Sequence, residues 1–396
     1  MPTNAATVGG LALAGLLALH PGTVAREPQR PSAEPTRGGL TEARRLATAY
    51  DAILQARFDE ARAQLATACP PAPAPACDAL REVAVWWEIQ QNQYDRTLDS
   101  RLQAAARTAI ESSTAWTVRE PQRAEAWFYL AGAYAPLSQW RVLRGERLAA
   151  ARDGKRIKDA LERALALDPA LQDAWFGIGL YHYYADVVPA ALKVLRFLLL
   201  LPGGDRRAGL QEMLRARDGG ELLRGEADYQ LHWLYLWYEE QPERARELLR
   251  SLDARFPSNP LFLERLGEVE HVYFSDHQAS ADAWRQLLDR ATRGRAMLPA
   301  LAQARARVGV AAESIELGRP AAAIDLLLPV IRTRPSAPHG VLALAYLTLG
   351  DAYAARDERA QATDAYTRAI SEAPRDDPEQ LRSRARDGLD RLRSKR

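Results

Sequence analysis

The chain has 396 residues, and its 53 Lys and Arg side chains nearly balance 51 Asp and Glu, which leaves a net charge of +2. This balance excludes a whole-protein electrostatic drive toward nucleic acid or an anionic membrane. Ala, Leu, Arg and Glu are abundant, and these residues are good helix formers. No convincing run of alternating β-branched residues occurs, so the composition predicts an all-α protein.

The first 25 residues contain an apolar run of twelve, from Val8 to Leu19, followed by the helix breaker at 20–22. That run is too short to span a hydrocarbon core about 30 Å thick. Small residues at 23–25 offer a cleavage site, so we expect 1–25 to be a signal peptide. The run lacks a preceding Lys or Arg, and a disordered apolar leader is the alternative. Residues 26–40 are rich in Pro, Gly and charge and predict a flexible linker.

The only two cysteines, Cys69 and Cys77, lie on either side of the sequence PPAPAPA. Two cysteines placed around one loop, behind a signal peptide, favour a local disulfide in an oxidising compartment. A polyproline segment prefers an extended conformation, so the loop must fold back to bring the two Cα atoms within about 7 Å. Two buried free thiols are the alternative.

The segment 123–184 repeats one pattern of helical periodicity. Its apolar positions are Trp127, Leu130 and Tyr134, then Ile157, Leu161 and Ala164, then Trp175, Ile178, Gly179 and His182. Pro121 precedes Trp127 by the same interval as Pro169 precedes Trp175. Two amphipathic helices and a turn with proline, repeated in register, resemble the tetratricopeptide repeat of bacterial secreted proteins.

This resemblance implies an all-α, right-handed superhelical solenoid of antiparallel helix pairs over residues 41–376. The best repeats are 124–171 with an insert, 172–185 as a first helix, 226–259, 304–337 and 343–376. The last of these, with Gly350, Tyr366 and Pro374, fits the pattern without a gap. Residues 377–396 predict a polar capping helix, which the open end of a solenoid needs.

The middle of the chain is also similar to the eukaryotic inclusion-body-clearance tetratricopeptide family. The similarity rests on Pro189, the apolar stretch Leu192 to Leu201, Gly204-Asp205-Arg206 and Gly209-Leu210. It covers roughly seventy residues, and Pro202-Gly203 replaces the aromatic with which the family usually continues.

Motifs for catalysis are lacking in the sequence. Nucleotide-binding, zinc-protease and nucleophile-elbow patterns are all missing, and Gly203-Gly204 is followed by Asp205-Arg206 rather than by Lys and Ser or Thr. His271 and His277 are six apart, which is a poor spacing for two metal ligands on one helix. We therefore predict no enzyme activity, no cofactor and no metal.

A basic stripe follows Tyr134, in the insert between the two helices of the first repeat. It comprises Arg141, Arg144, Arg147, Lys155 and Lys158. Interspersed acidic residues dilute it. A solvated extension of the helices is one interpretation, and binding of an acidic partner or lipid headgroups is the other.

The aromatic residues of the central helices are the better functional clue. The tetratricopeptide alignment implies that one face of these helices lines a concave groove, and it places there Phe128, Phe176, Leu180, Tyr183, Tyr184, Gln230, Leu234, Trp237 and Tyr238. Such a groove suits a peptide segment or a hydrophobic ligand. Burial of these residues between superhelical turns is the alternative.

The sequence thus predicts a non-catalytic protein-interaction scaffold of the cell envelope, periplasmic or secreted, which binds a partner protein in its groove. A carrier for a lipid or a hydrophobic small molecule, built on the apolar stretch 187–201 and the aromatic face, is the second hypothesis.

Overall fold

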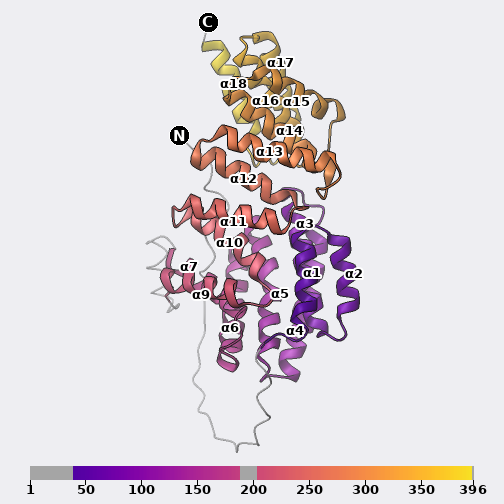
Figure 1. Cartoon of the computed structure of the whole chain (residues 1–396), viewed down its shortest axis with the longest axis vertical. Helices are drawn as coiled ribbons and strands as arrows, with labels where there is room; N and C mark the ends of the chain where they lie inside the picture. The colour runs from indigo at the N-terminus through magenta and orange to yellow at the C-terminus, as the bar shows by residue number, and fades with distance from the viewer. Residues whose placement is uncertain (1–38, 188–202, 395–396) are drawn as a thin grey trace, which may run out of the picture. The chain divides into compact units, whose positions relative to one another are not determined.

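The computed structural model describes residues 39–187 and 203–394, which contain seventeen α-helices and no strand (Figure 1). The expected signal peptide, all but the last two residues of the expected linker, and the apolar stretch after Val187 lie outside the described residues. Among the described helices, none is both long and apolar enough to cross a membrane. The prediction of an all-α chain of consecutively packed helices is confirmed.

The chain divides into two compact units. Unit 1 takes residues 1–51, 59–86 and 99–227, and unit 2 takes residues 52–58, 87–98 and 228–396. The helices that lie wholly or partly in unit 1 are α1 (Ala43–Leu54), α2 (Phe58–Ala68), α3 (Ala74–Gln90), α4 (Asp99–Arg119), α5 (Ala124–Leu143), α6 (Arg147–Leu167), α7 (Ala174–Val187), α9 (Arg206–Gly219) and α10 (Arg224–Trp237).

In unit 1, consecutive helices pack against each other from α4 through α5 and α6 to α7, and α7 packs on α9. Helices α5 and α6 have 20 and 21 residues, against 14 for α7 and α9. The basic insert is therefore helical: it adds turns to the end of α5 and to the beginning of α6. Two buried residues of this insert, Ala150 and Ala151, have small side chains.

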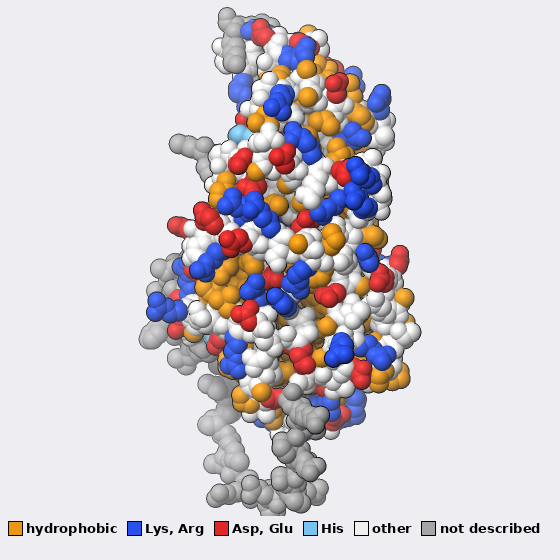
Figure 2. All heavy atoms as spheres, viewed as in Figure 1, with side chains coloured by type: hydrophobic (Ala, Val, Ile, Leu, Met, Phe, Trp, Pro, Cys, Tyr) orange, Lys and Arg blue, Asp and Glu red, His pale blue; other side chains and the backbone are white. Residues whose placement is uncertain are grey.

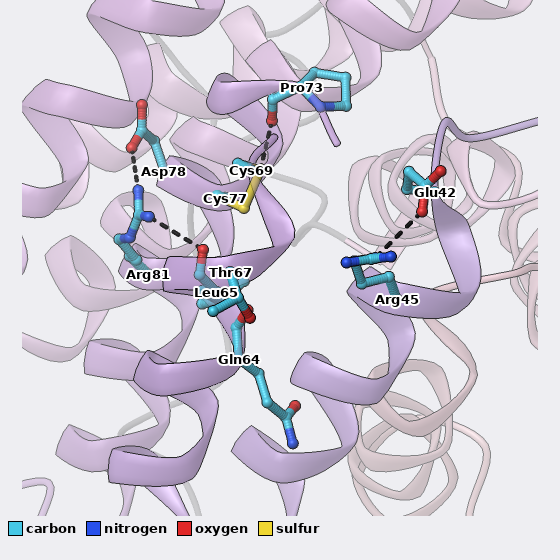
Figure 3. Close-up of a disulfide and its surroundings, with 10 residues drawn as sticks. All are labelled: Glu42, Arg45, Gln64, Leu65, Thr67, Cys69, Pro73, Cys77, Asp78 and Arg81. Carbon is cyan, nitrogen blue, oxygen red and sulfur yellow. Dashed lines mark hydrogen bonds and ion pairs between the residues drawn. A yellow bond between two sulfur atoms is a disulfide. The ribbon is translucent and has the colours of Figure 1, made fainter. Parts of the chain in front are cut away.

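The predicted disulfide between Cys69 and Cys77 is present, with 6.3 Å between the two Cα atoms (Figure 3). The residues from Cys69 to Pro73 form a tight turn, because α2 ends at Ala68 and α3 begins at Ala74. The amide of Ala72 donates to the carbonyl of Ala68 at 2.8 Å. Arg81 on α3 donates to the carbonyl of Leu65 on α2 and so adds a second link across this helix pair.

Unit 2 continues with α11 (Pro242–Arg255), α12 (Pro260–Phe274), α13 (His277–Thr292), α14 (Pro299–Glu316), α15 (Pro320–Thr333), α16 (Val341–Ala355), α17 (Arg359–Glu372) and α18 (Leu381–Ser394). Each of these helices packs on the next, and Figure 1 shows α12, α13 and α14 stacked in chain order, with α15 to α18 beyond them. Contacts also join α12 to α14, α14 to α16 and α16 to α18. The even-numbered helices therefore form one layer and the odd-numbered helices a second layer, as in a solenoid of helix pairs.

Glycines in the even-numbered layer allow large side chains of the other layer to come close. A Cβ on Gly350 of α16 would lie 2.5 Å from the ring of Tyr366 on α17, and a Cβ on Gly309 of α14 would lie 2.3 Å from Trp284 on α13. Both rings are buried. The repeat pattern needs a glycine at these positions because the ring of the neighbouring helix occupies the space that a larger side chain would fill.

Ion pairs between helices accompany the apolar contacts in unit 2. Asp228 of α10 pairs with Arg255 of α11 at 2.9 Å, and Glu270 of α12 pairs with Arg250 of α11 at 3.0 Å. Each of these carboxylates is buried, and its arginine reaches it from the neighbouring helix. Buried carboxylates need such partners, because an unpaired charge in the interior is costly.

Candidate binding surface

The predicted groove residues of unit 1 lie on α5 and α7. Phe128, Phe176 and Tyr183 are buried, and Tyr183 is 0% exposed. Leu180 and Tyr184 are partly exposed, and the rings of Tyr183 and Tyr184 meet edge to face at 5.9 Å. In unit 1, the accessible part of the predicted groove is therefore limited to Leu180 and Tyr184.

The predicted groove residues of unit 2 lie on α10 and, for Tyr238, directly after it. Leu234 is buried, whereas Gln230, Trp237 and Tyr238 are partly exposed. Half-burial raises the pKa of the Tyr238 phenol, so this hydroxyl is neutral at physiological pH. The two sets of predicted groove residues thus belong to different compact units of the chain.

Trp233 extends the unit 2 set, although the groove prediction did not include it. Its ring stacks on that of Trp237 with 4.3 Å between centroids and 28° between planes. The guanidinium of Arg265 on α12 lies 5.5 Å from the centroid of Trp233. Both tryptophans are partly exposed. Aromatic and arginine side chains of this kind dominate binding energy at protein interfaces.

Tyr273, at the end of α12, completes the group and is 37% exposed. Burial raises the pKa of its phenol, while a hydrogen bond with Trp237 opposes that shift. We call Trp233, Trp237, Arg265 and Tyr273 the aromatic surface. It extends over two helices of the same layer, and it presents ring faces and a hydroxyl. The Arg265 side chain is only 16% exposed and pairs with Glu268, so it supports the rings from the side.

Buried aromatic residues support this surface from below. The rings of Tyr229 and Phe262 meet edge to face at 6.1 Å, and Trp87 lies 4.8 Å from Tyr229. His232 is also buried, and burial lowers its pKa to about 3, so it is neutral at physiological pH. Its Nδ1–H donates to the carbonyl of Tyr229. The partly exposed tryptophans therefore lie next to a cluster of buried rings. His232 adds no charge to this cluster.

Contacts between α10 and α12 follow in the same order along both helices. Tyr229 meets Phe262, Trp233 meets Arg265 one turn later, and Trp237 meets Tyr273 after that. The two helices thus run parallel, which is the relation expected between the first helices of successive pairs.

The predicted basic stripe lies on the lengthened parts of α5 and α6, where nearby carboxylates pair with four of its five members. Arg144 forms two bonds with Asp99, at 2.7 and 2.9 Å. The other pairs are Arg141 with Asp153, Lys155 with Asp159 and Lys158 with Glu162. Arg147 is exposed. Most of the positive charge of the predicted stripe is therefore balanced by neighbouring carboxylates.

Positive and negative side chains are also mixed over the rest of the visible surface. Figure 2 shows Lys and Arg side chains mixed with Asp and Glu over the described residues, together with scattered hydrophobic side chains. No broad field of one charge sign covers the described residues on this face, in agreement with the near-zero net charge.

His271 and His277 come together with Glu313, a contact that the sequence did not reveal. Nδ1 of His271 and Nδ1 of His277 each lie 2.9 Å from a different oxygen of the Glu313 carboxylate. The hydrogen bond with Glu313 raises the pKa of His271. Burial alone would raise the pKa of Glu313, but the hydrogen bonds from both histidines lower it.

Comparisons with known proteins give distant structural neighbours only. Neither the scan against protein-family models nor the search of curated proteins gives a match. Among solved structures, the chain is similar to the APC/C hetero-tetramer Cut9–Hcn1 (16% identity over 80% of this chain, TM-score 0.39) and to yeast Tom70 (12% over 80%, TM-score 0.41). A dimeric human IFIT1 bound to PPP-AAAA gives 13% identity over 88% of this chain and 73% of its own, with a TM-score of 0.44.

The chain spans 55% of the matched Cut9–Hcn1 chain and 65% of the Tom70 chain. At these TM-scores the comparisons carry no argument about this chain. The helix order and the layered packing define the class of protein: an all-α chain of tetratricopeptide-like helix pairs.

Proposed function

We propose that this protein is a non-catalytic interaction scaffold that binds a segment of a partner protein on the even-numbered helix layer. The observation that carries the proposal is the aromatic surface. Trp233 and Trp237 present stacked rings, Arg265 lies against one of them, and Tyr273 adds a hydroxyl. Tryptophan, tyrosine and arginine are the side chains most enriched among binding hot spots.

A protein segment fits the chemistry of this surface better than a purely apolar ligand does. The hydroxyl of Tyr273 offers a hydrogen-bond donor next to ring faces, and peptides carry carbonyl groups that accept such bonds. A surface that combines an apolar centre with polar groups at its margin is typical of protein interfaces.

Export to an oxidising compartment of the cell envelope is part of the proposal. The Cys69–Cys77 disulfide supports it, because disulfides persist mainly outside the reducing cytosol. The apolar run Val8 to Leu19, followed by small residues, supports it from the sequence. Retention of the protein in the periplasm and release into the medium are both compatible with these features.

The test is a comparison of three immobilised chains incubated with an envelope extract: the wild type, Trp237→Ala, and Leu328→Ala. Leu328 lies on α15 of the other layer, so its variant is the matched control. Bound proteins and lipids are identified together by mass spectrometry, and circular dichroism verifies that each chain is helical. We expect one protein to be retained by the wild type and by the control and lost from Trp237→Ala.

Retention of that protein by Trp237→Ala would place binding elsewhere. Recovery of lipid without protein would instead favour a carrier for a hydrophobic ligand.

A further inference from the structure

The turn between α12 and α13 brings two histidines onto one carboxylate. His271 is in the last turn of α12, His277 is the first residue of α13, and Glu313 is on α14. The ligand atoms that these three residues offer all lie within 4.8 Å of one another. The histidine rings are 5.2 Å apart and inclined at 67°, so neither ring blocks the other.

The backbone of the turn fixes this arrangement. Ser275 adopts a left-handed conformation with φ of 51°, which ends α12. The amide of Asp276 then donates to the carbonyl of Glu270 at 3.0 Å, and the Asp276 carboxylate caps α13 by accepting from the amide of Ala279 at 2.8 Å. The two histidines are thus held by helix ends rather than by a loose loop.

The burial of the three side chains is uneven in a way that suits a metal site. The Glu313 side chain is 5% exposed, while His271 and His277 are 43% and 30% exposed. A buried carboxylate supplies a fixed negative charge at the base, and two imidazoles at the surface leave an approach from solvent. Metal sites with three protein ligands keep a position open in this way for water or for an incoming ligand.

The spacing of the ligand atoms is close to what a metal requires. Tetrahedral zinc with bonds of about 2.0–2.1 Å holds its ligand atoms about 3.3 Å apart. Each histidine nitrogen now lies 2.9 Å from its carboxylate oxygen, so small side-chain rotations are sufficient to admit an ion. Two imidazoles and a carboxylate form the donor set that suits zinc and its transition-metal neighbours, whereas calcium and magnesium prefer oxygen alone.

We propose that His271, His277 and Glu313 form a binding site for one divalent transition-metal ion, with zinc as its representative and with water in the remaining coordination position.

Other histidines of the described residues offer a direct comparison. His182 pairs with Glu212 at 2.7 Å, and His339 pairs with Asp376 at 3.1 Å. Each of these is a single histidine on a single carboxylate, whereas Glu313 faces two. In the part of the chain that the structure describes, only the Glu313 group brings three such ligands together. The histidine–carboxylate pair at His339 is therefore a matched control for loss of an imidazole.

The experiment is a zinc titration of the chain, freed of metal by a chelator, against a chromophoric zinc indicator. The wild type should bind one equivalent of zinc. His271→Ala, His277→Ala and Glu313→Gln should each weaken zinc binding at least tenfold, and His339→Ala should not change it. Calcium and magnesium in excess should not displace zinc from the wild type. Circular dichroism verifies the helix content of each variant.

Cobalt provides a second measurement that needs no variant. Co²⁺ added to the wild-type chain should produce visible absorption bands of a four- or five-coordinate ion, and zinc should abolish them. Absence of a saturable zinc site, or zinc binding that is unchanged in His277→Ala, would overturn the proposal. The cluster would then be a pair of hydrogen bonds between histidine and glutamate only.

Discussion

The indole rings of Trp233 and Trp237 stack one helical turn apart on α10, with 4.3 Å between their centroids. Because both rings stand on the same helix, their arrangement is set by the fold and is present before any partner arrives. Arg265 against Trp233 restricts it further. A surface that is ordered in advance loses less side-chain entropy when it binds, so more of the contact energy is available for affinity.

The close contact between Gly350 and Tyr366 predicts a strong effect of adding one methyl group. Gly350→Ala should lower the free energy of unfolding by about 1–3 kcal/mol, because the new Cβ would lie 2.5 Å from a buried ring. Gly132→Ala on α5 is the control, since nothing lies within 4 Å of its added Cβ. It should raise stability by about 0.5–1 kcal/mol through helix propensity. Urea unfolding followed by circular dichroism compares the two, and equal effects would contradict this packing of α16 on α17.

The ion pair between Glu264 of α12 and Arg305 of α14 predicts a second large effect. Burial raises the pKa of Glu264, and the charge of Arg305 opposes that shift. Arg305→Ala leaves the buried carboxylate without this partner and should cost about 3 kcal/mol of stability.

Two further variants test that explanation. Arg285→Ala removes the exposed pair with Asp282 and should cost about 0.5 kcal/mol or less. The double variant Glu264→Leu with Arg305→Met removes both charges and should be closer to the wild type than Arg305→Ala is. Thermal unfolding at equal pH and salt measures all of them. If the double variant is less stable than Arg305→Ala, the two side chains contribute to stability through packing and not through their charges.

Reduction of the Cys69–Cys77 disulfide should destabilise unit 1. The sequence separation is 8, and closure of so short a loop contributes about 2–3 kcal/mol in the chain-entropy model. Denaturant unfolding with and without a reductant measures the loss. The double variant Cys69→Ala with Cys77→Ala should be insensitive to the reductant, and a wild type that is equally insensitive would refute the expected contribution.

Glu82 on α3 predicts a dependence of stability on pH. Burial raises the pKa of its carboxyl well above the usual value, a backbone hydrogen bond at Leu137 opposes the shift, and the charge of Asp153 adds to it. The folded chain then binds a proton at Glu82 more tightly than the unfolded chain does. The contribution of Glu82 to stability should therefore fall as pH rises from about 4.3, the unfolded value, through the raised folded value.

Glu82→Gln removes this titration. At neutral pH the variant should be more stable than the wild type, by on the order of 1 kcal/mol, because no buried charge has to form. Its stability should also fall less with rising pH. Glu111→Gln, an exposed carboxylate on α4, is the control and should leave the profile unchanged. Identical pH profiles for the wild type and Glu82→Gln would contradict a raised pKa at the buried carboxyl.

The pattern of the sequence was sufficient to predict an all-α chain of packed helices, and the reason is visible at Gly350. A glycine that recurs directly after an apolar residue marks the place where a neighbouring ring must fit, and this information lies in the local sequence. The disulfide was predictable for a similar reason, because the two cysteines are close along the chain.

Most residues of the candidate sites are brought together by contacts between different helices, which no local pattern encodes. Helical spacing argued against His271 and His277 as a pair, but the left-handed Ser275 places them on two helices, and Glu313 arrives from a third. The repeat alignment named Tyr183 for the groove, yet the structure buries it completely. Trp233 was missed, although its spacing of four from Trp237 on a helix was a signal for a shared face.

Site-specific photo-cross-linking tests the central claim most directly, because it reports what touches a chosen side chain. A benzophenone amino acid replaces either Tyr273 of the aromatic surface or Leu328 of the other layer, which are 37% and 39% exposed and so present similar areas. After irradiation of the envelope fraction, cross-linked species are identified by mass spectrometry. The scaffold function predicts a defined protein adduct from position 273 that is absent from position 328 and lost when Trp237→Ala is added. The same adducts from both positions, or none from position 273, would contradict it.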